Sequence, residues 1–221
     1  MIAARIGIFL ALALLSYGLV WAVRWWAHKA QVMDVPNERS SHTTVTPRGG
    51  GVAVILVCLL GWAYLAWHVG ETGEASTLYP WLGGGAVALI ALLGLVDDMR
   101  TLPSLPRLGV QLLIALGLTA YLPTFTTVDC LPGVTFEAGW LGTAVTFLWI
   151  VGLINVYNFM DGIDGIAGLQ GLLAGLGWAA LTYETSAAGS LGFFLAAACL
   201  GFLVHNWSPA KIFMGDVGSA T

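Results

Sequence analysis

The chain has 221 residues, of which 58% are hydrophobic and only 9% are charged, and its mean hydropathy is +0.85. About 25% of the residues are charged in an ordinary soluble domain, so this composition excludes a disordered chain, a nucleic-acid-binding protein and a typical soluble enzyme. The net charge of −4 and three scattered cysteines indicate neither a nucleic-acid partner nor a disulfide framework. We therefore expect a lipid bilayer to surround most of the chain.

The charged residues divide the chain into uncharged stretches of bilayer length. A helix that crosses a membrane needs about 20 mainly apolar residues. The pattern predicts an all-α, polytopic integral membrane protein that forms a single domain over residues 1–221, with seven transmembrane helices. These helices are expected at residues 6–23, 49–70, 75–96, 108–128, 138–160, 165–183 and 185–210.

Lys and Arg are distributed unevenly over the predicted connections. The segments after the first, third and seventh helices contain Lys or Arg, whereas those after the second, fourth and sixth contain acidic charge only. Because cytoplasmic loops have an excess of Lys and Arg, this distribution predicts a periplasmic N-terminus and cytoplasmic odd-numbered connections. Seven acidic residues then share the cytoplasmic side: Asp34, Glu38, Asp97, Asp98, Asp161, Asp164 and Asp216.

The adjacent pair Asp97 and Asp98 closes the third predicted helix. Two neighbouring carboxylates at a membrane boundary repel each other and lose hydration, so each needs a nearby cation or takes up a proton. Cations suit a helix C-terminus better than acids do, which favours a functional pair. The structural alternative is a solvated helix end with Arg100 as the partner.

Polar residues recur at every third position between the fifth and sixth predicted helices, as Asn155, Asn158, Asp161 and Asp164. Neighbours at this spacing can share one helical face. Amide and carboxylate oxygens are hard ligands that suit Mg²⁺, with Mn²⁺ as the alternative. Asp216 lies between glycines and adds an acid on the same side of the membrane. The structural alternative for both segments is a capped turn.

The first cytoplasmic connection, residues 34–51, contains Arg39, His42 and Arg48 beside a glycine run that opens the second helix. Arg side chains and the amides of a helix N-terminus can hold phosphate oxygens. The alternative is a basic loop that only sets the topology of the chain. No Gly-Lys-Ser/Thr follows the glycines, so ATP is not indicated.

Together the four segments closely resemble the polyprenyl-phosphate N-acetylhexosamine-1-phosphate transferases, an integral membrane family that includes phospho-N-acetylmuramoyl-pentapeptide transferase. The most specific combination is Asn-x-x-Asn-Phe-Met-Asp-Gly-Ile-Asp-Gly at 155–165 with Phe-Met-Gly-Asp-Val-Gly-Ser at 213–219. The loop at 34–51 looks more like the branch that initiates O-antigen or other envelope polysaccharides than like the muramoyl-pentapeptide branch.

The resemblance implies a bacterial inner-membrane enzyme with a cytoplasmic active site. It would transfer an N-acetylhexosamine-1-phosphate from a UDP-sugar to undecaprenyl phosphate and release UMP. The implied catalytic residues are Asp97, Asp98, Asp161 and Asp164. The implied substrate-binding residues are Arg39, His42, Arg48 and Asn155. The implied Mg²⁺ ligands are Asn158 and Asp216.

The chain departs from the family pattern in three respects. The minor one is Val45, at a position where Pro is common. Thr101 stands where an Asp-Asp-x-x-Asp motif has its last acid. The family also continues through further helices and a cytoplasmic loop that contacts the nucleotide sugar. We therefore expect this chain to be a fragment that is inactive alone. The identity of the transferred sugar stays open at this point, because the loop expected to select it lies beyond Thr221. Membrane prenyltransferases and transporters are the rival classes, but the former pair their acids as Asp-x-x-Asp and the latter need polar residues at mid-bilayer depth.

Overall fold

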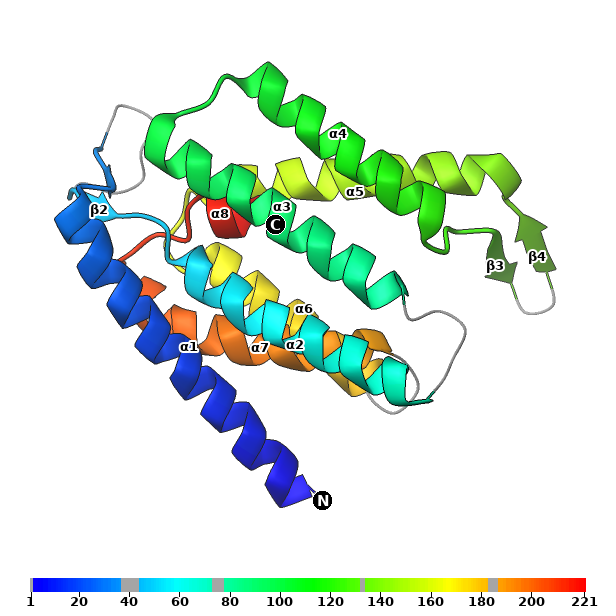
Figure 1. The fold of residues 1–221 in the computed structure, drawn as a ribbon, viewed down its shortest axis with the longest axis horizontal. Helices are drawn as coiled ribbons and strands as arrows, with labels where there is room; N and C mark the ends of the chain where they lie inside the picture. The colour runs from blue at the N-terminus through cyan, green and yellow to red at the C-terminus, as the bar shows by residue number, and fades with distance from the viewer. Residues whose placement is uncertain (1, 37–43, 73–77, 132–133, 183–186) are drawn as a thin grey trace.

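A computed structural model describes residues 2–36, 44–72, 78–131, 134–182 and 187–221 of the chain. Its helices, in order, are α1 (Ile2–Ala30), α2 (Gly51–Thr72), α3 (Leu78–Arg100), α4 (Ser104–Tyr121), α5 (Gly139–Met160), α6 (Ile166–Thr182), α7 (Ala187–Asn206) and the four-residue α8 (Asp216–Ser219). Two antiparallel hairpins pair β1 (Met33–Asp34) with β2 (Thr46–Pro47) and β3 (Thr127–Leu131) with β4 (Val134–Glu137). Figure 1 shows the helices lying side by side.

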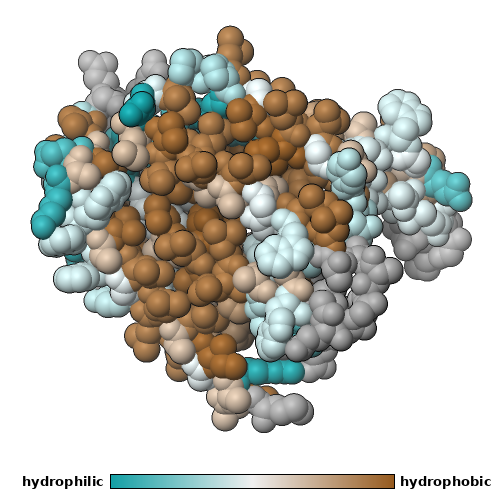
Figure 2. All heavy atoms as spheres, in the orientation of Figure 1, coloured by the Kyte–Doolittle hydropathy of each residue, from teal (hydrophilic) through white to brown (hydrophobic). Residues whose placement is uncertain are grey.

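The long helices confirm a polytopic, helical membrane protein. Within the described residues, six helices are long and apolar enough to cross a bilayer, and α6 is equally apolar but only 17 residues long. Backbone polar groups have no water to bond in lipid, so spanning segments satisfy them internally as helices. Figure 2 shows the resulting apolar surface across the helices, with hydrophilic residues mostly at the margins of the view.

Several helix ends differ from the sequence expectation. Helix α1 continues past residue 23 to Ala30, and α3 continues past residue 96 to Arg100. Charged residues mark the edge of the bilayer but do not end a helix. Helix α4 runs from Ser104 to Tyr121 and not over 108–128, because Leu122 precedes Pro123 and is extended. The residues after it form the β3–β4 hairpin instead.

Helix α7 packs against α6, α1 and α2. Small residues let these helices approach closely, as transmembrane packing favours. A Cβ at Gly201 of α7 would lie 2.2 Å from the backbone oxygen of Ala13 in α1. Nearby, the buried Ser16 hydroxyl donates a hydrogen bond to Ala198 O at 2.7 Å. The core beside this contact contains Phe202, Val20, Val57 and Ile212, all fully buried.

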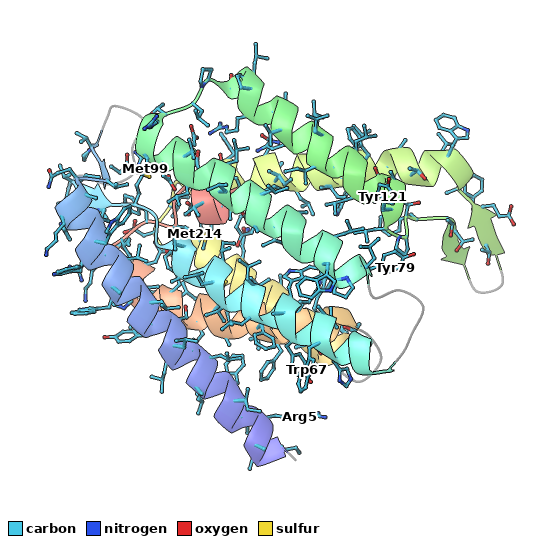
Figure 3. All side chains as sticks on the ribbon, viewed as in Figure 1. Arg5, Trp67, Tyr79, Met99, Tyr121 and Met214 are labelled. Carbon is cyan, nitrogen blue, oxygen red and sulfur yellow. The ribbon has the colours of Figure 1, made fainter. Side chains whose placement is uncertain are left out.

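The bundle has two distinct ends. Met99 at the end of α3 and Met214 before α8 lie towards one end, whereas Trp67, Tyr79 and Tyr121 lie towards the other (Figure 3). Aromatic side chains of this kind are typical of the membrane–water interface. The short helix α8 lies at the first end and contacts α3, α2 and α5. Segments far apart in the sequence therefore meet there.

Candidate functional site at one end of the bundle

The loop before Asp216 is held against the start of α2. Backbone amides of Gly50 and Gly51 donate hydrogen bonds to Phe213 O at 2.9 Å and Met214 O at 2.8 Å. A Cβ at Gly51 would lie 2.4 Å from the Cα of Gly218, so a larger residue does not fit. The glycine run was expected to offer its amides to phosphate oxygens. In the structure, two of these amides instead bind the Asp216 loop.

Asp98 positions α8 by accepting two main-chain hydrogen bonds. Its Oδ1 accepts from the amide of Asp216 at 3.0 Å, and its Oδ2 accepts from the amide of Val217 at 3.1 Å. Gly215 precedes them with φ of +75°, a conformation that L side chains rarely adopt. A Cβ there would also lie 2.6 Å from Asp98 Oδ2. Asp98 thus fixes the backbone that presents Asp216.

Arg107, in the first turn of α4, joins two of the acids. Its Nη1 donates a hydrogen bond to Asp97 Oδ2 and another to Asp216 Oδ2, the latter at 2.7 Å. Asp97 is buried, with 7% of its surface exposed, and its Oδ1 accepts from the amide of Leu102. Both oxygens of Asp97 are therefore engaged, and a guanidinium lies between it and Asp216.

Asn158, near the end of α5, reaches the same carboxylate from the opposite side. Its Nδ2 donates to Asp216 Oδ1 at 2.8 Å and to the Ser219 hydroxyl at 2.9 Å. Asn158 and Asp216, which the family resemblance assigns to one metal, are therefore in contact, although they lie 58 positions apart in the sequence. Ser219 was missed by sequence reasoning, since a hydroxyl after a glycine loop has no distinctive signal.

Asp161 follows α5 and faces the same group of acids. Burial, together with the charges of Asp216 and Asp98, raises the pKa of Asp161 to about 8. Burial and the neighbouring Asp97 carboxyl raise the pKa of Asp216 to about 6. The cause is the same in both cases, because negative charges are crowded where little water can solvate them. The acidic cluster, defined here as Asp97, Asp98, Asp161 and Asp216, thus favours a cation.

Asp164 lies next to a different loop. Its Oδ2 accepts a hydrogen bond from the amide of Ala210 at 2.9 Å. Beside it, the buried Asn206 accepts from the amide of Gly165 and donates to Ile212 O, both at 3.0 Å. These bonds tie the turn between α5 and α6 to the segment after α7. Asp164 holds the two motif segments together and does not join the acidic cluster.

Two of the four expected substrate-binding residues, Arg48 and Asn155, lie in the described part of the chain, in separate places. Arg48 forms an ion pair with Asp34 at 2.6 Å, which links β2 to β1. Asn155 donates to Gln111 Oε1 at 3.0 Å, so it joins α5 to α4 about one helical turn away from Asn158. Arg39 and His42 lie outside the described residues.

The chemistry of the acidic cluster fits a hard divalent cation. Carboxylate and amide oxygens are the ligands that Mg²⁺ prefers, and a rotated Asn158 amide presents oxygen in place of nitrogen. Among the described residues, no group of three or more His, Cys, Asp or Glu side chains is arranged to hold a metal ion. The guanidinium of Arg107 lies between Asp97 and Asp216.

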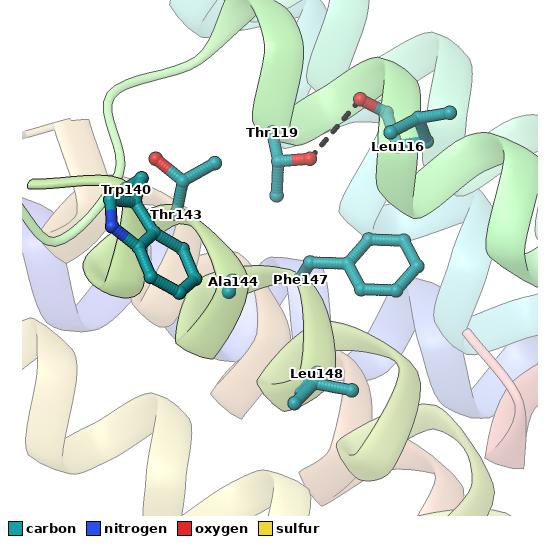
Figure 4. A pocket seen from close by; sticks show the side chains of 7 residues that line it. All are labelled: Leu116, Thr119, Trp140, Thr143, Ala144, Phe147 and Leu148. Atoms are coloured by element: carbon teal, nitrogen blue, oxygen red, sulfur yellow. Dashed lines mark hydrogen bonds between the residues drawn. The ribbon is translucent and has the colours of Figure 1, made fainter.

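An apolar cavity of about 510 Å³ lies elsewhere, between α4 and α5 (Figure 4). It is lined by Leu116, Thr119, Trp140, Thr143, Ala144, Phe147 and Leu148. Thr119 follows Arg107 by twelve residues in the same helix, which places it about 18 Å along the axis. This lining contains no titratable group, so the polar cluster is the candidate site for chemistry.

The chain is similar in sequence to known proteins. Residues 81–221 match the sequence model described as "Glycosyl transferase family 4". Over 203 residues, which are 87% of this chain and 53% of the relative, the chain is 34% identical to the "Probable undecaprenyl-phosphate N-acetylglucosaminyl 1-phosphate transferase" of Bacillus subtilis. It is 32% identical over 240 residues, 95% of this chain and 55% of the relative, to the "Decaprenyl-phosphate N-acetylglucosaminephosphotransferase" of Mycobacterium tuberculosis.

A third relative is the "Phospho-N-acetylmuramoyl-pentapeptide-transferase" of a Synechococcus species, 33% identical over 228 residues, with 94% of this chain and 62% of the relative covered. The chain therefore spans between about half and three fifths of the length of the curated relatives that it matches. The family match covers all the clustered acids and the helices that present them. The chain belongs to glycosyl transferase family 4.

Proposed function

We propose that this chain provides the catalytic centre of a polyprenyl-phosphate sugar-1-phosphate transferase. The reaction moves an N-acetylhexosamine-1-phosphate from a UDP-sugar to undecaprenyl phosphate and releases UMP. The acceptor phosphate attacks the phosphorus that bears the sugar, a phosphoanhydride bond forms there, and the bond to the UMP oxygen breaks. Membership of the family and the names of the relatives support this reaction class.

One observation carries the proposal. Acids from α3, from the end of α5 and from α8 lie together at one end of a membrane bundle, with Asn158 and Arg107 among them. Donor and acceptor are both phosphates, so the main obstacle to the reaction is the repulsion between two anions. A site at the membrane edge that concentrates carboxylates selects for the divalent cation that such substrates need.

Mg²⁺ is the proposed cofactor, with Mn²⁺ as the alternative. Asp216, Asn158 and Asp161 would hold it. Asn158 contacts the Asp216 carboxylate, and burial together with the neighbouring acids raises the pKa values of Asp161 and Asp216. When bound, the cation neutralises the diphosphate of the nucleotide sugar. Asp98 acts by positioning α8, and Asp164 by joining the two loops.

The proposed donor is a UDP-N-acetylhexosamine of the kind used to initiate O-antigen or a related envelope polysaccharide. The first relative is named for an N-acetylglucosaminyl donor and matches 87% of this chain. A muramoyl-pentapeptide donor is the second candidate, supported by the relative that matches 94% of the chain. In both cases we propose a multi-pass protein of the bacterial inner membrane with the acidic cluster on the cytoplasmic side.

Measuring UMP release with undecaprenyl phosphate separates these donors. The assay uses the chain itself and a chimera that continues from Thr221 into the remaining sequence of the Bacillus subtilis relative, since the chain covers 53% of that protein. We expect Mg²⁺-dependent UMP release by the chimera from UDP-N-acetylglucosamine and not from UDP-N-acetylmuramoyl-pentapeptide. The reverse preference would move the chain to the second branch, and no release from either donor would refute the reaction class.

A further inference from the structure

Resting on the proposed metal site, we propose that Arg107 is an internal counter-cation that a divalent cation displaces. In the conformation described above, its guanidinium balances Asp97 and Asp216. When the metal binds, the guanidinium swings away, and the two carboxylates exchange one cation for another. Arg107 is a positioning residue on this view, and it sets the metal affinity of the site.

The contacts place Arg107 where a cation is needed most. Its Nη1 reaches Asp97 Oδ2 and also Asp216 Oδ2, the latter at 2.7 Å, so one nitrogen bridges two carboxylates. Among the ion pairs found in the described residues, neither acid has a second cationic partner. Arg48, another arginine at this end, is paired with Asp34.

The bridge also occupies the oxygens that a metal would require. Asp216 Oδ1 accepts from Asn158 and Asp216 Oδ2 accepts from Arg107, so both oxygens are bound to donors. Asp97 is similarly satisfied, by Arg107 and by the amide of Leu102. Each oxygen keeps a second lone pair, but a divalent cation that bound Asp216 now would stand beside the guanidinium charge. Of the two donors to Asp216, Arg107 carries the charge that opposes metal binding.

Arg107 is able to leave without disturbing the fold. It lies in the first turn of α4, on a long side chain of which 28% is exposed. Asp98 holds α8 through backbone amides, and this bond does not involve Arg107. Withdrawal of the guanidinium therefore leaves Asp216 in place.

Metal binding to the purified chain tests the displacement. Mn²⁺ serves as the probe, and its free concentration is followed by electron paramagnetic resonance at pH 8. Arg107→Gln is expected to bind Mn²⁺ at least about tenfold more tightly than wild type, the size of an ordinary coupling between two bound groups. Arg107→Lys keeps the charge and should stay close to wild type. Arg100→Gln is the matched control, because exposed Arg100 ends α3, the helix that contains Asp97, and its loss should not change the affinity.

Thermal unfolding in chelator tests the charge balance independently of any metal. Arg107→Gln should lower the melting temperature by about 3 °C or more. The double variant with Asp216→Asn should recover most of this loss, because one of the two facing carboxylates is then neutral. Saturating Mn²⁺ should restore the single variant in the same way.

Different results would contradict the displacement of Arg107 and the proposed metal site. If Arg107→Gln binds Mn²⁺ no more tightly than wild type while wild type binds well, the displacement proposal is overturned and Arg107 assists the metal. If the double variant recovers no stability, Arg107 is not a counter-cation. If neither wild type nor Arg107→Gln binds Mn²⁺, the displacement proposal and the proposed metal site both fail, whereas a recovered melting temperature would still show the charge balance.

Discussion

At the residue scale, Asp216 is the point where the contacts of the site converge. Its carboxylate touches Arg107 and Asn158, and its main-chain amide is bound by Asp98. Arg107 and Asn158 therefore contact the charged side chain of Asp216, whereas Asp98 holds its backbone. A substitution that removes the charge leaves the bonds that place α8.

Asp216→Asn should abolish sugar-phosphate transfer by the chimera. Losing a ligand charge for the proposed Mg²⁺ costs about 4 kcal/mol of transition-state stabilisation, or roughly a thousandfold in rate. Membrane insertion and melting temperature should change little, because the amide bond to Asp98 persists. UMP release at varied Mg²⁺ is the measurement, with Glu137→Gln of the remote, exposed end of β4 as the control. Turnover equal to wild type would pass the metal role to Asp161.

The raised pKa of Asp161 predicts how the stability of the protein depends on pH in the presence of chelator. Its pKa rises from 3.8 to about 8 on folding, so the folded state binds this proton more tightly than the unfolded state does. The resulting stability is fully present below pH 3.8 and is lost as the pH rises through about 8. The melting temperature should therefore fall between pH 5 and pH 9, and Asp161→Asn should flatten that fall. Equal slopes for the two proteins would show that Asp161 is not the group responsible.

At the scale of elements, the contact between α3 and α8 decides where the acids meet. Gly94 lies one turn before Asp97 and Asp98, and a Cβ there would lie 2.3 Å from the backbone oxygen of Asp216. Backbone cannot yield as a flexible side chain can. The absence of a side chain at this position is thus a requirement for docking α8.

Gly94→Ala should displace α8 and lower stability by about 1–3 kcal/mol, the usual cost of overpacking. Mn²⁺ affinity should fall with it, because Asp216 moves away from Asn158. Gly85→Ala is a matched control in the same helix, where an added Cβ meets no atom within 4 Å. Thermal unfolding and Mn²⁺ titration of the two variants provide the comparison. Equal losses of stability and of Mn²⁺ affinity in both variants would show that the close contact at Gly94 is not what positions α8.

At the scale of the whole molecule, the two ends of the bundle differ in chemistry. The acidic cluster, Arg107 and the Arg48–Asp34 pair occupy one end, and the β3–β4 hairpin follows the opposite end of α4. Lys and Arg in the odd-numbered connections predict that the first end is cytoplasmic. On that prediction, the acidic cluster faces the cytoplasm.

Cysteine labelling in intact cells tests the orientation. In a background with Cys58, Cys130 and Cys199 replaced by alanine, a membrane-impermeant maleimide should label Glu137→Cys and leave Thr44→Cys unlabelled. Permeabilised cells should label both positions, which controls for reactivity. Labelling of Thr44→Cys but not Glu137→Cys in intact cells would invert the topology.

Much of the site could be predicted from residue type and side of the membrane. The pairing of Asn158 with Asp216 and the nearness of Asp97, Asp98 and Asp161 follow from motifs that share one end of the bundle. Their exact partners could not be predicted. Asp98 bonds to backbone amides at Asp216 and Val217, and Asp164 bonds to Ala210, because packing of α3, α8 and the loop after α7 sets those distances.

The sequence by itself determined the class of protein, since each apolar stretch must satisfy its own backbone in lipid. That constraint is local and can be read along the chain. Only the tertiary structure decided what Arg107 does. The sequence shows it as one basic residue of a cytoplasmic connection, yet its partner Asp216 is 109 positions away. The charge of a residue depends on its own side chain alone. The electrostatic field around that side chain depends on helices that come from elsewhere in the chain.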